Sequence, residues 1–170
     1  SANPGVNMTN AVNSTRPEYV FMASKGGAAA RLESVKVFGM FGAGNVFTGS
    51  FVKATISGGV GAELDWGIPF ASRPYSLKGY YSYAPKVIDN ASGIHADKMG
   101  TMDKAQIQVI LTDWDEPFRV ATASGNFVDI EKDPHIIAHG VIETDVDTQG
   151  KYQEFECVLE YRDLLRTPKY

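Results

Sequence analysis

The stretch QEFECVLEYR, residues 153–162, is the clearest evidence for the fold class that we predict from this sequence. Its apolar side chains alternate with polar ones and are Phe155, Cys157, Leu159 and Tyr161. A period of two residues is typical of a β-strand with one face buried and the other in water. Cys157 is therefore predicted to be a small core residue, and no histidine stands near it in sequence to suggest a catalytic thiol. As the only cysteine, it also excludes an internal disulfide.

The same alternation recurs in KAQIQVILTDW (104–114) and SLKGYYSY (76–83), and more loosely in NVFTGSFVKATIS (45–57). Turn-forming clusters separate these runs, at residues 57–59, 123–126 and 147–150. Short strands punctuated by turns predict an all-β protein of two packed antiparallel sheets. We expect one core to hold the inward residues of the runs 104–114 and 153–162, which are Ile107, Val109, Leu111, Phe155, Cys157, Leu159 and Tyr161. Only residues 99–104 and 162–166 invite a short helix.

Length and composition predict one globular domain. The chain has 170 residues, 44% hydrophobic and 21% charged, with a formal net charge of −4. We expect an extended N-terminal segment over residues 1–27, followed by a single domain over 28–170. No basic run of the kind that binds nucleic acid is present, and no apolar run approaches the roughly 20 residues that span a bilayer. Because Ser1 does not begin a signal peptide, we expect any targeting signal to have preceded this sequence.

Two patterns resemble metal sites. His135 and His139 have the spacing of zinc ligands on a helix, but they lie in PHIIAHGVI, which predicts a strand. Four residues of strand separate them by about 13 Å, too far to share one ion, so we predict no zinc and no other cofactor. Residues 145–156 approach the calcium loop of an EF-hand, but strands flank them, and a solvated hairpin loop fits better.

Carboxylates supply the only candidates for catalysis. The pairs Glu63 with Asp65 and Asp113 with Asp115 have i, i+2 spacing, which on a strand puts both acids on one face about 6.6 Å apart. Such a separation suits a glycoside hydrolase. No acid lies in an apolar sequence setting that would raise its pKa, so solvated surface acids are the alternative. No serine or cysteine nucleophile motif occurs.

Aromatic side chains supply the candidates for binding. In WGIPFASRPYSLKGYYSYAP (66–85), Tyr80 is expected to point away from the core, beside Lys78 and Ser82. A tyrosine on an exposed sheet face can stack on the C–H groups of a sugar. The predicted saccharide site is bordered by Trp66, Arg73, Tyr80 and Trp114. In the alternative, the aromatic rings plug the ends of the sandwich and Arg73 pairs with a nearby acid.

Four segments, in this order, resemble the putative carbohydrate metabolism domain family. They are GAGNVFTGSF, LDWGIPFASRPYSLKGYYSYAP, DKAQIQVILTDW and YQEFECVLEYRD with its following TPKY. The resemblance covers about residues 28–170 and implies a jelly-roll β-sandwich like that of carbohydrate-binding modules, which often hold a structural calcium. The family's pattern continues past TPKY into a further loop and strand, which this sequence does not contain.

The resemblance also implies a biological setting. Members are found in cell-envelope lipoproteins of glycan-degrading gut bacteria, behind a lipoprotein signal and an immunoglobulin-like N-terminal domain. We therefore expect an exported protein, periplasmic or on the outer cell surface, whose partner is an oligo- or polysaccharide. Three functions stay open: a glycan-binding module, a glycoside hydrolase, and a structural or protein-interaction domain. Of these, binding is favoured.

Overall fold

The computed structural model shows an all-β protein, which confirms the predicted fold class. The structure describes residues 15–22, 25–37, 40–55, 61–91 and 93–169. Within them every strand pair is antiparallel, and no α-helix occurs. The jelly-roll order of the strands stays a prediction.

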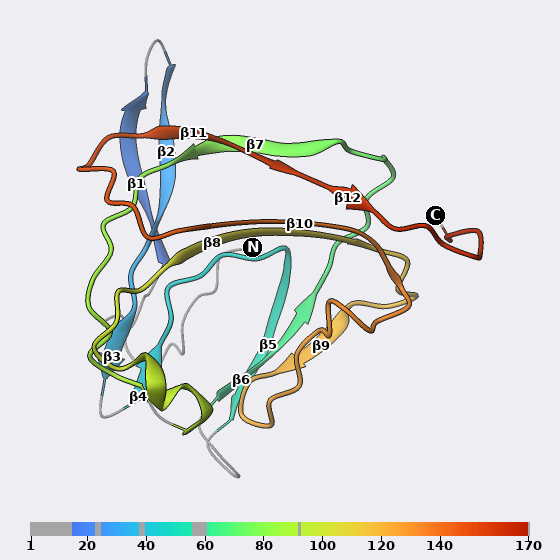
Figure 1. Cartoon of the computed structure of the whole chain (residues 1–170), viewed down its shortest axis with the longest axis horizontal. Coiled ribbons are helices and arrows are strands. Elements are labelled where there is room, and N and C mark those ends of the chain that lie inside the picture. Colours follow the sequence, from blue (N-terminus) through green and yellow to red (C-terminus); the bar gives the residue numbers. More distant parts are fainter. Residues whose placement is uncertain (1–14, 23–24, 38–39, 56–60, 92, 170) are drawn as a thin grey trace. The chain divides into compact units, whose positions relative to one another are not determined.

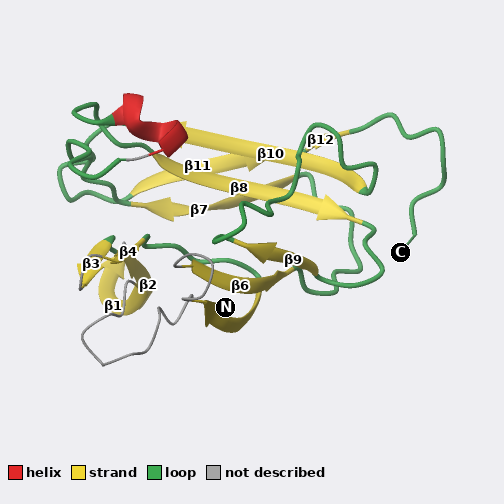
Figure 2. Cartoon of the chain, turned by 90° about the horizontal axis from the view of Figure 1, so that it is seen from below, coloured by secondary structure: helices red, strands yellow, loops and turns green. Residues whose placement is uncertain are grey.

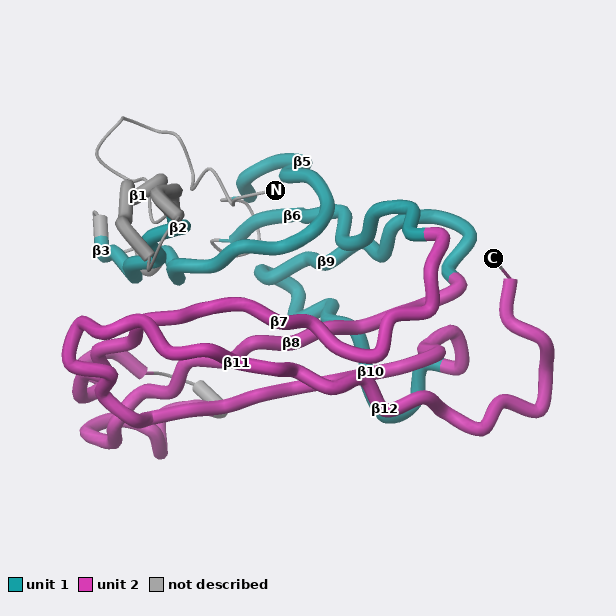
Figure 3. Tube along the Cα trace, turned by 90° about the horizontal axis from the view of Figure 1, so that it is seen from above, with its two compact units in different colours: residues 1–70, 114–133 teal, residues 71–113, 134–170 magenta. Residues whose placement is uncertain are grey.

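The chain divides into two compact units (Figure 3). Unit 1 comprises residues 1–70 and 114–133, and unit 2 comprises residues 71–113 and 134–170. Each unit is therefore built from two separate stretches of sequence. The first fourteen residues of the predicted N-terminal segment lie outside the described residues, and the rest of that segment carries β1 and the beginning of β2.

Unit 1 begins with two hairpins. β1 (Thr15–Met22) pairs with β2 (Lys25–Leu32) along its whole length. β3 (Val35–Val37) pairs with β4 (Met40–Gly42). These four strands precede the stretch of sequence that carries the candidate residues.

A three-stranded sheet completes unit 1. It consists of β5 (Gly49–Thr55), β6 (Gly61–Trp66) and β9 (Phe118–Ala121), in the order β5-β6-β9. Leu64 of β6 stands opposite Val120 of β9, and both side chains are buried, with 5% and 0% exposure. Because side chains alternate along a strand, burial of this pair turns the residues on either side of Leu64 to the opposite face.

Unit 2 is a two-layer β-sandwich (Figures 1 and 2). One layer pairs β7 (Ser76–Tyr81) with β11 (Gln153–Val158). The other contains β8 (Ala105–Thr112), β10 (Ile136–Thr144) and β12 (Glu160–Tyr161), in the order β12-β10-β8. The region PHIIAHGVI is thus mainly a strand, as its β-branched residues predict.

The stretch 153–162 contributes to both layers of unit 2. Its first part, β11, pairs with β7, and its last part, β12, pairs with β10. At the changeover the backbone N–H of Leu159 donates to the carbonyl of Tyr75 at 2.9 Å, and that of Arg162 donates to the carbonyl of Ile137 at 2.9 Å. One continuous segment therefore joins the two layers by hydrogen bonds to each.

The core of unit 2 lies between these layers. Its buried apolar residues are Ile136, Ile137, Ala138, Cys157 and Leu159. The predicted burial of Cys157 and Leu159 is confirmed, and the Cys157 thiol lies 3.9 Å from the carbonyl oxygen of Ile107. Burial raises the pKa of that thiol. The other predicted core residues are only partly buried, namely Ile107, Val109, Leu111, Phe155 and Tyr161.

A glycine lets the layers approach. A Cβ atom added at Gly140 of β10 would lie 2.3 Å from the carbonyl oxygen of Val158 and 3.0 Å from the sulfur of Cys157. Real Cβ atoms do not come so close to backbone. Gly140 therefore sets the spacing between β10 and β11.

Two local expectations were wrong. The loop after β10 does not close a hairpin, because β10 pairs with β8 and β12 while β11 pairs with β7. Instead it connects the two layers, and Thr148 within it is buried and hydrogen bonded to Tyr83. The short helix is a 3-10 helix at Gly93–Lys98 rather than at 99–104 or 162–166.

Candidate functional site

The outward face of β7 and β11 carries an exposed tyrosine among polar side chains. Tyr80 is 57% exposed, and in the register of the two strands it stands opposite Glu154. Lys78 stands opposite Glu156, and Ser76 opposite Val158. Residues at such positions share one face of a sheet, with Cβ atoms about 5 Å apart between opposite partners. We name this surface the Tyr80 face; it consists of Ser76, Lys78, Tyr80, Glu154, Glu156 and Val158.

One carboxylate of the Tyr80 face is held by two neighbours. Glu156 Oε1 accepts a hydrogen bond from Ser76 Oγ at 2.8 Å and lies 3.1 Å from Lys78 Nζ. The hydrogen bond from Ser76, and then the one from Lys78, lower the pKa of Glu156. Glu156 is therefore an ionised group with a fixed position, and its charge is balanced by that of Lys78.

The other carboxylate of the face has no such partner. Glu154 is exposed, and within the described residues no hydrogen bond or ion pair involves its side chain. It lies directly across the strand pair from Tyr80. The face therefore combines an aromatic ring with one carboxylate that can accept hydrogen bonds from a ligand.

Packing on the inward side holds Tyr80 outward. The ring of Phe155 lies over Gly79, where an added Cβ would meet it at 2.8 Å. Tyr81 packs edge-on against the same ring, with centroids 6.3 Å apart. With Gly79 and Tyr81 turned inward, strand alternation turns Tyr80 to solvent. The same alternation predicts Leu77 on the inward side, but this residue is 44% exposed.

Arg73 packs on the aromatic ring of Tyr161, also in unit 2. Its guanidinium lies 4.3 Å from the ring centroid of Tyr161, a cation–π contact. The Tyr161 hydroxyl in turn donates to the carbonyl of Pro74 at 2.6 Å. These contacts attach the segment before β7 to β12. Among the described residues, no ion pair between Arg73 and an acid is found.

Trp66 and Trp114 belong to unit 1, and each packs on a phenylalanine. Trp66 ends β6, and its ring lies 6.3 Å from that of Phe47. Trp114 lies 5.2 Å from Phe118, and its indole N–H donates to Asp133 Oδ2 at 2.9 Å. Both indoles are partly exposed. Their contacts favour a packing role, and the ligand-binding role of these two residues stays a prediction.

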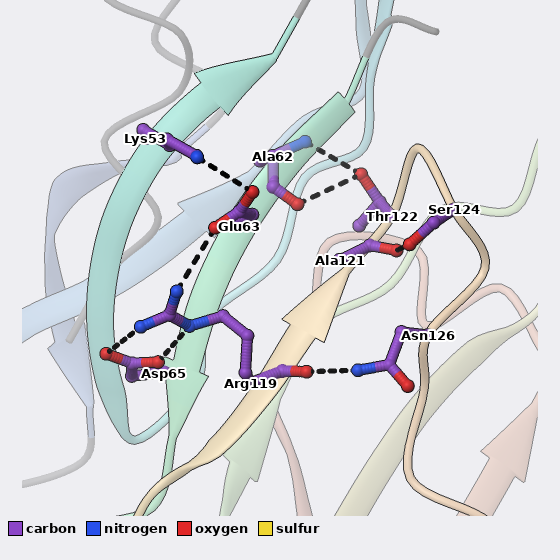
Figure 4. Close-up of polar contacts among 9 residues, drawn as sticks. All are labelled: Lys53, Ala62, Glu63, Asp65, Arg119, Ala121, Thr122, Ser124 and Asn126. Atoms are coloured by element: carbon purple, nitrogen blue, oxygen red, sulfur yellow. Dashed lines mark hydrogen bonds and ion pairs between the residues drawn. The ribbon is translucent and has the colours of Figure 1, made fainter. Parts of the chain in front are cut away.

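Glu63 and Asp65 form an ionic cluster on β6 (Figure 4). Arg119 of β9 donates to both oxygens of Asp65, at 2.5 and 3.2 Å, and to Glu63 Oε2 at 3.1 Å. Lys53 of β5 lies 3.1 Å from Glu63 Oε1, and its hydrogen bond lowers the pKa of Glu63. The two acids share a face, as their spacing predicts, but both are paired with cations.

A β-bulge brings Lys53 to that cluster. Phe51 stands opposite Leu64, and Lys53 opposite Glu63, so β5 has an extra residue, Val52, at this point. In a regular ladder Val52 would face Glu63.

Asp113 and Asp115 are not a pair on a strand, because β8 ends at Thr112. The Asp113 side chain is fully buried and accepts hydrogen bonds from both Nη groups of Arg166. His135 Nδ1 lies 3.0 Å from Oδ1, and the backbone N–H of Lys169 lies 3.1 Å from Oδ2. Arg166 is the main reason that the pKa of Asp113 lies well below its usual range. A carboxylate held in this way cannot supply a proton near neutral pH.

His135, which precedes β10, and His139, which lies within it, have different partners. His135 contacts Asp113, and His139 Nε2 lies 2.9 Å from Gln108 Nε2. Within the described residues, no three His, Cys, Asp or Glu side chains gather as a metal site would require. The last acid of the EF-hand-like stretch, Glu156, is held by Ser76 and Lys78. In the described part of the chain, no helix is long and apolar enough to cross a membrane.

The sequence predicted that Tyr80 and Lys78 share one face of a strand. It did not predict that Glu154 and Glu156 of another strand lie on the same sheet face. The alternation in residues 153–162 shows that these glutamates share a face. It does not show that β11 pairs with β7, because strand pairing depends on residues some 70 positions apart in the chain. The register of that pair is what assembles the Tyr80 face.

Comparison with known proteins gives a family match. The model of a family described as putative carbohydrate metabolism domain matches residues 1–170. Neither curated proteins nor solved structures gave a match.

Proposed function

The chain belongs to the putative carbohydrate metabolism domain family, and from that premise we propose that it is a non-catalytic glycan-binding module. The observation that carries the proposal is the Tyr80 face, where a 57% exposed ring lies opposite a carboxylate without a partner. The ring offers a flat apolar surface to the C–H groups of a pyranose. The carboxylate of Glu154 and the ammonium of Lys78 offer hydrogen bonds to its hydroxyls.

The four candidate acids support binding over hydrolysis. A glycoside hydrolase needs one carboxyl group that stays protonated until it donates to the leaving group, which requires a raised pKa. Glu63 and Asp113 both have lowered pKa values. Asp65 is bound through both oxygens to Arg119. Three of the four candidate acids are thus committed to cations, and the fourth, Asp115, is exposed and does not lie on a strand with Asp113, because β8 ends at Thr112.

The proposal also concerns where the protein acts. Polymeric glycans are met outside the cytoplasm, and we propose that the full-length protein acts in the periplasm or on the outer cell surface. The family resemblance further implies a lipid anchor and an immunoglobulin-like N-terminal domain. Fractionation of cells that express the full-length gene would test the location. Recovery in the cytoplasmic fraction would contradict it.

The test of binding is the substitution Tyr80→Ala, measured by affinity electrophoresis and a glycan array. We expect glycan retention to be lost while the melting temperature stays within about 2 °C, as for other surface substitutions. The matched control is Tyr75→Ala, because Tyr75 is 71% exposed but precedes β7 and lies off the Tyr80 face. The control should retain binding. Equal retention by the Tyr80→Ala variant and the wild type would overturn the proposal.

A further inference from the structure

We infer that the Tyr80 face selects uncharged saccharides and rejects anionic ones, and that Glu154 decides this. The inference rests on the proposed function and adds the chemical class of the ligand. It starts from the charges of the face. Lys78 and Glu156 pair at 3.1 Å, so their charges cancel. Glu154 remains, and the face carries one net negative charge at neutral pH.

The position of that charge matters as much as its sign. Glu154 stands directly opposite Tyr80, so a sugar stacked on the ring lies within a side chain's length of the carboxylate. An acidic sugar would bring a second carboxylate or a sulfate into this space. Within the described residues no cation pairs with Glu154, so no ion pair of that carboxylate offsets the repulsion.

The ring adds a second reason. The face of an aromatic ring carries partial negative charge, which attracts C–H groups and cations and repels anions. The cation nearest along β7, Lys78, is already held by Glu156. The charge of Lys78 is therefore already offset by Glu156 before an anionic ligand arrives.

A neutral sugar meets the opposite situation. Each hydroxyl is a hydrogen-bond donor, and an ionised carboxylate accepts several such bonds. Bonds to an ionised acceptor are about twice as strong as those between neutral groups. Glu154 therefore favours neutral hydroxyls for the same reason that it disfavours acidic groups. The net charge of −4 on the whole chain acts in the same direction at longer range.

The test compares neutral and acidic polysaccharides as probes. The neutral set is mannan, xylan, galactan and β-glucan, and the acidic set is polygalacturonate, alginate and chondroitin sulfate. We expect the wild type to be retained by at least one neutral probe and by none of the acidic ones. Fully methyl-esterified polygalacturonate, which keeps the backbone but loses the charge, should be retained at least as well as its acidic parent.

Substitutions of Glu154 separate charge from shape. Glu154→Lys should gain binding to acidic probes by roughly tenfold or more at low salt, and high salt should remove the gain. Glu154→Gln should weaken neutral binding severalfold, because an amide oxygen is a weaker acceptor than a carboxylate. The matched control is Glu116→Lys, which changes the net charge equally at an exposed residue outside the face. It should leave both sets of probes unchanged.

The possible failures can be told apart. Binding to an acidic probe by the wild type, lost in Tyr80→Ala, would overturn the inference and keep the proposed function. Equal gains in Glu154→Lys and Glu116→Lys would also overturn it, since the effect would then come from net charge alone. Retention by no probe of either set, or retention that does not depend on Tyr80, would overturn the proposed function and this inference with it.

Discussion

A single buried carboxylate, Asp113, shows how one residue organises the end of a strand. It lies just past β8 and receives hydrogen bonds from Arg166, His135 and the backbone of Lys169. Arg166 also donates to the carbonyl of Pro134 at 2.8 Å. A buried charge is tolerated only when it is paired and hydrogen bonded in this way. Asp113 is thus a structural anchor for the last residues of the chain.

Replacing this anchor should destabilise the protein and change its response to acid. We predict that Asp113→Asn lowers the free energy of unfolding at pH 7 by about 1.5–3 kcal/mol, the range for hydrogen bonds to charged groups. The pKa of Asp113 is lowered in the folded protein, so its contribution is present above the unfolded value of about 4 and is lost as the pH falls. The difference between variant and wild type should therefore shrink on acidification.

Urea unfolding at pH 7 and at pH 3 measures both effects. The control is Asp163→Asn, an exposed acid of the same C-terminal stretch, which should change stability by less than about 0.5 kcal/mol. If Asp113→Asn is as stable as the wild type at pH 7, the anchoring role is wrong.

At the scale of elements, the close approach of β10 and β11 sets the geometry of the sandwich in unit 2. Gly140 permits it, because any side chain there would meet the backbone of Val158. The same approach places Cys157 against β8, with its thiol 3.9 Å from the carbonyl of Ile107. The outward orientation of the Tyr80 side chain depends on the packing of β11 on β7, because the ring of Phe155 from β11 packs on the inward side, over Gly79.

Adding one methyl group at this crossing should separate the layers. We predict that Gly140→Ala lowers stability by about 1–3 kcal/mol, the usual cost of overpacking, and the melting temperature by several degrees. The control is Gly42→Ala in β4, where an added Cβ meets nothing closer than 3.6 Å. Thermal unfolding followed by circular dichroism compares the two. Equal melting temperatures for both variants would contradict the role given to Gly140.

At the scale of the whole molecule, each unit has buried residues of its own. Those of unit 1 include Leu64 and Val120, and those of unit 2 include Ile136, Cys157 and Leu159. These side chains are apolar, and the buried polar side chains of the described residues, Asp113 and Thr148, are hydrogen bonded within the protein. Burial of apolar surface and hydrogen bonds to these two buried polar side chains thus stabilise the described structure.

We predict that the protein holds no stoichiometric zinc and that its stability does not depend on this metal. His135 and His139 have separate partners, Asp113 and Gln108, and no third ligand joins them in the described part. Elemental analysis after dialysis should find less than one zinc per chain, and a zinc-specific chelator should leave the melting temperature unchanged. One tightly held zinc per chain would contradict this. The structural calcium stays a separate prediction, measured as a rise in melting temperature with added calcium.

The local features of this protein could be predicted from its amino-acid sequence. Period-two alternation predicted the strands around Leu111, Tyr80 and Cys157 and the inward burial of Cys157, because side-chain direction on a strand depends only on position along it. Turn residues predicted the breaks at 123–126 and 147–150, where Gly125 and Gly150 have positive φ angles. The quoted motifs also indicated the family, which the match over residues 1–170 confirms.

The pairing of the strands could not be predicted from the sequence and is known from the folded structure. The pairing of β7 with β11 joins Tyr80 to Glu154, and the contact of Arg166 with Asp113 spans 53 positions of sequence. The loop at 147–150 was mistaken for a hairpin turn because a turn looks the same whether it joins two strands of one sheet or two layers. Pairing is chosen by the burial of all apolar faces together, which no single stretch of sequence specifies. The Tyr80 face is a product of that choice.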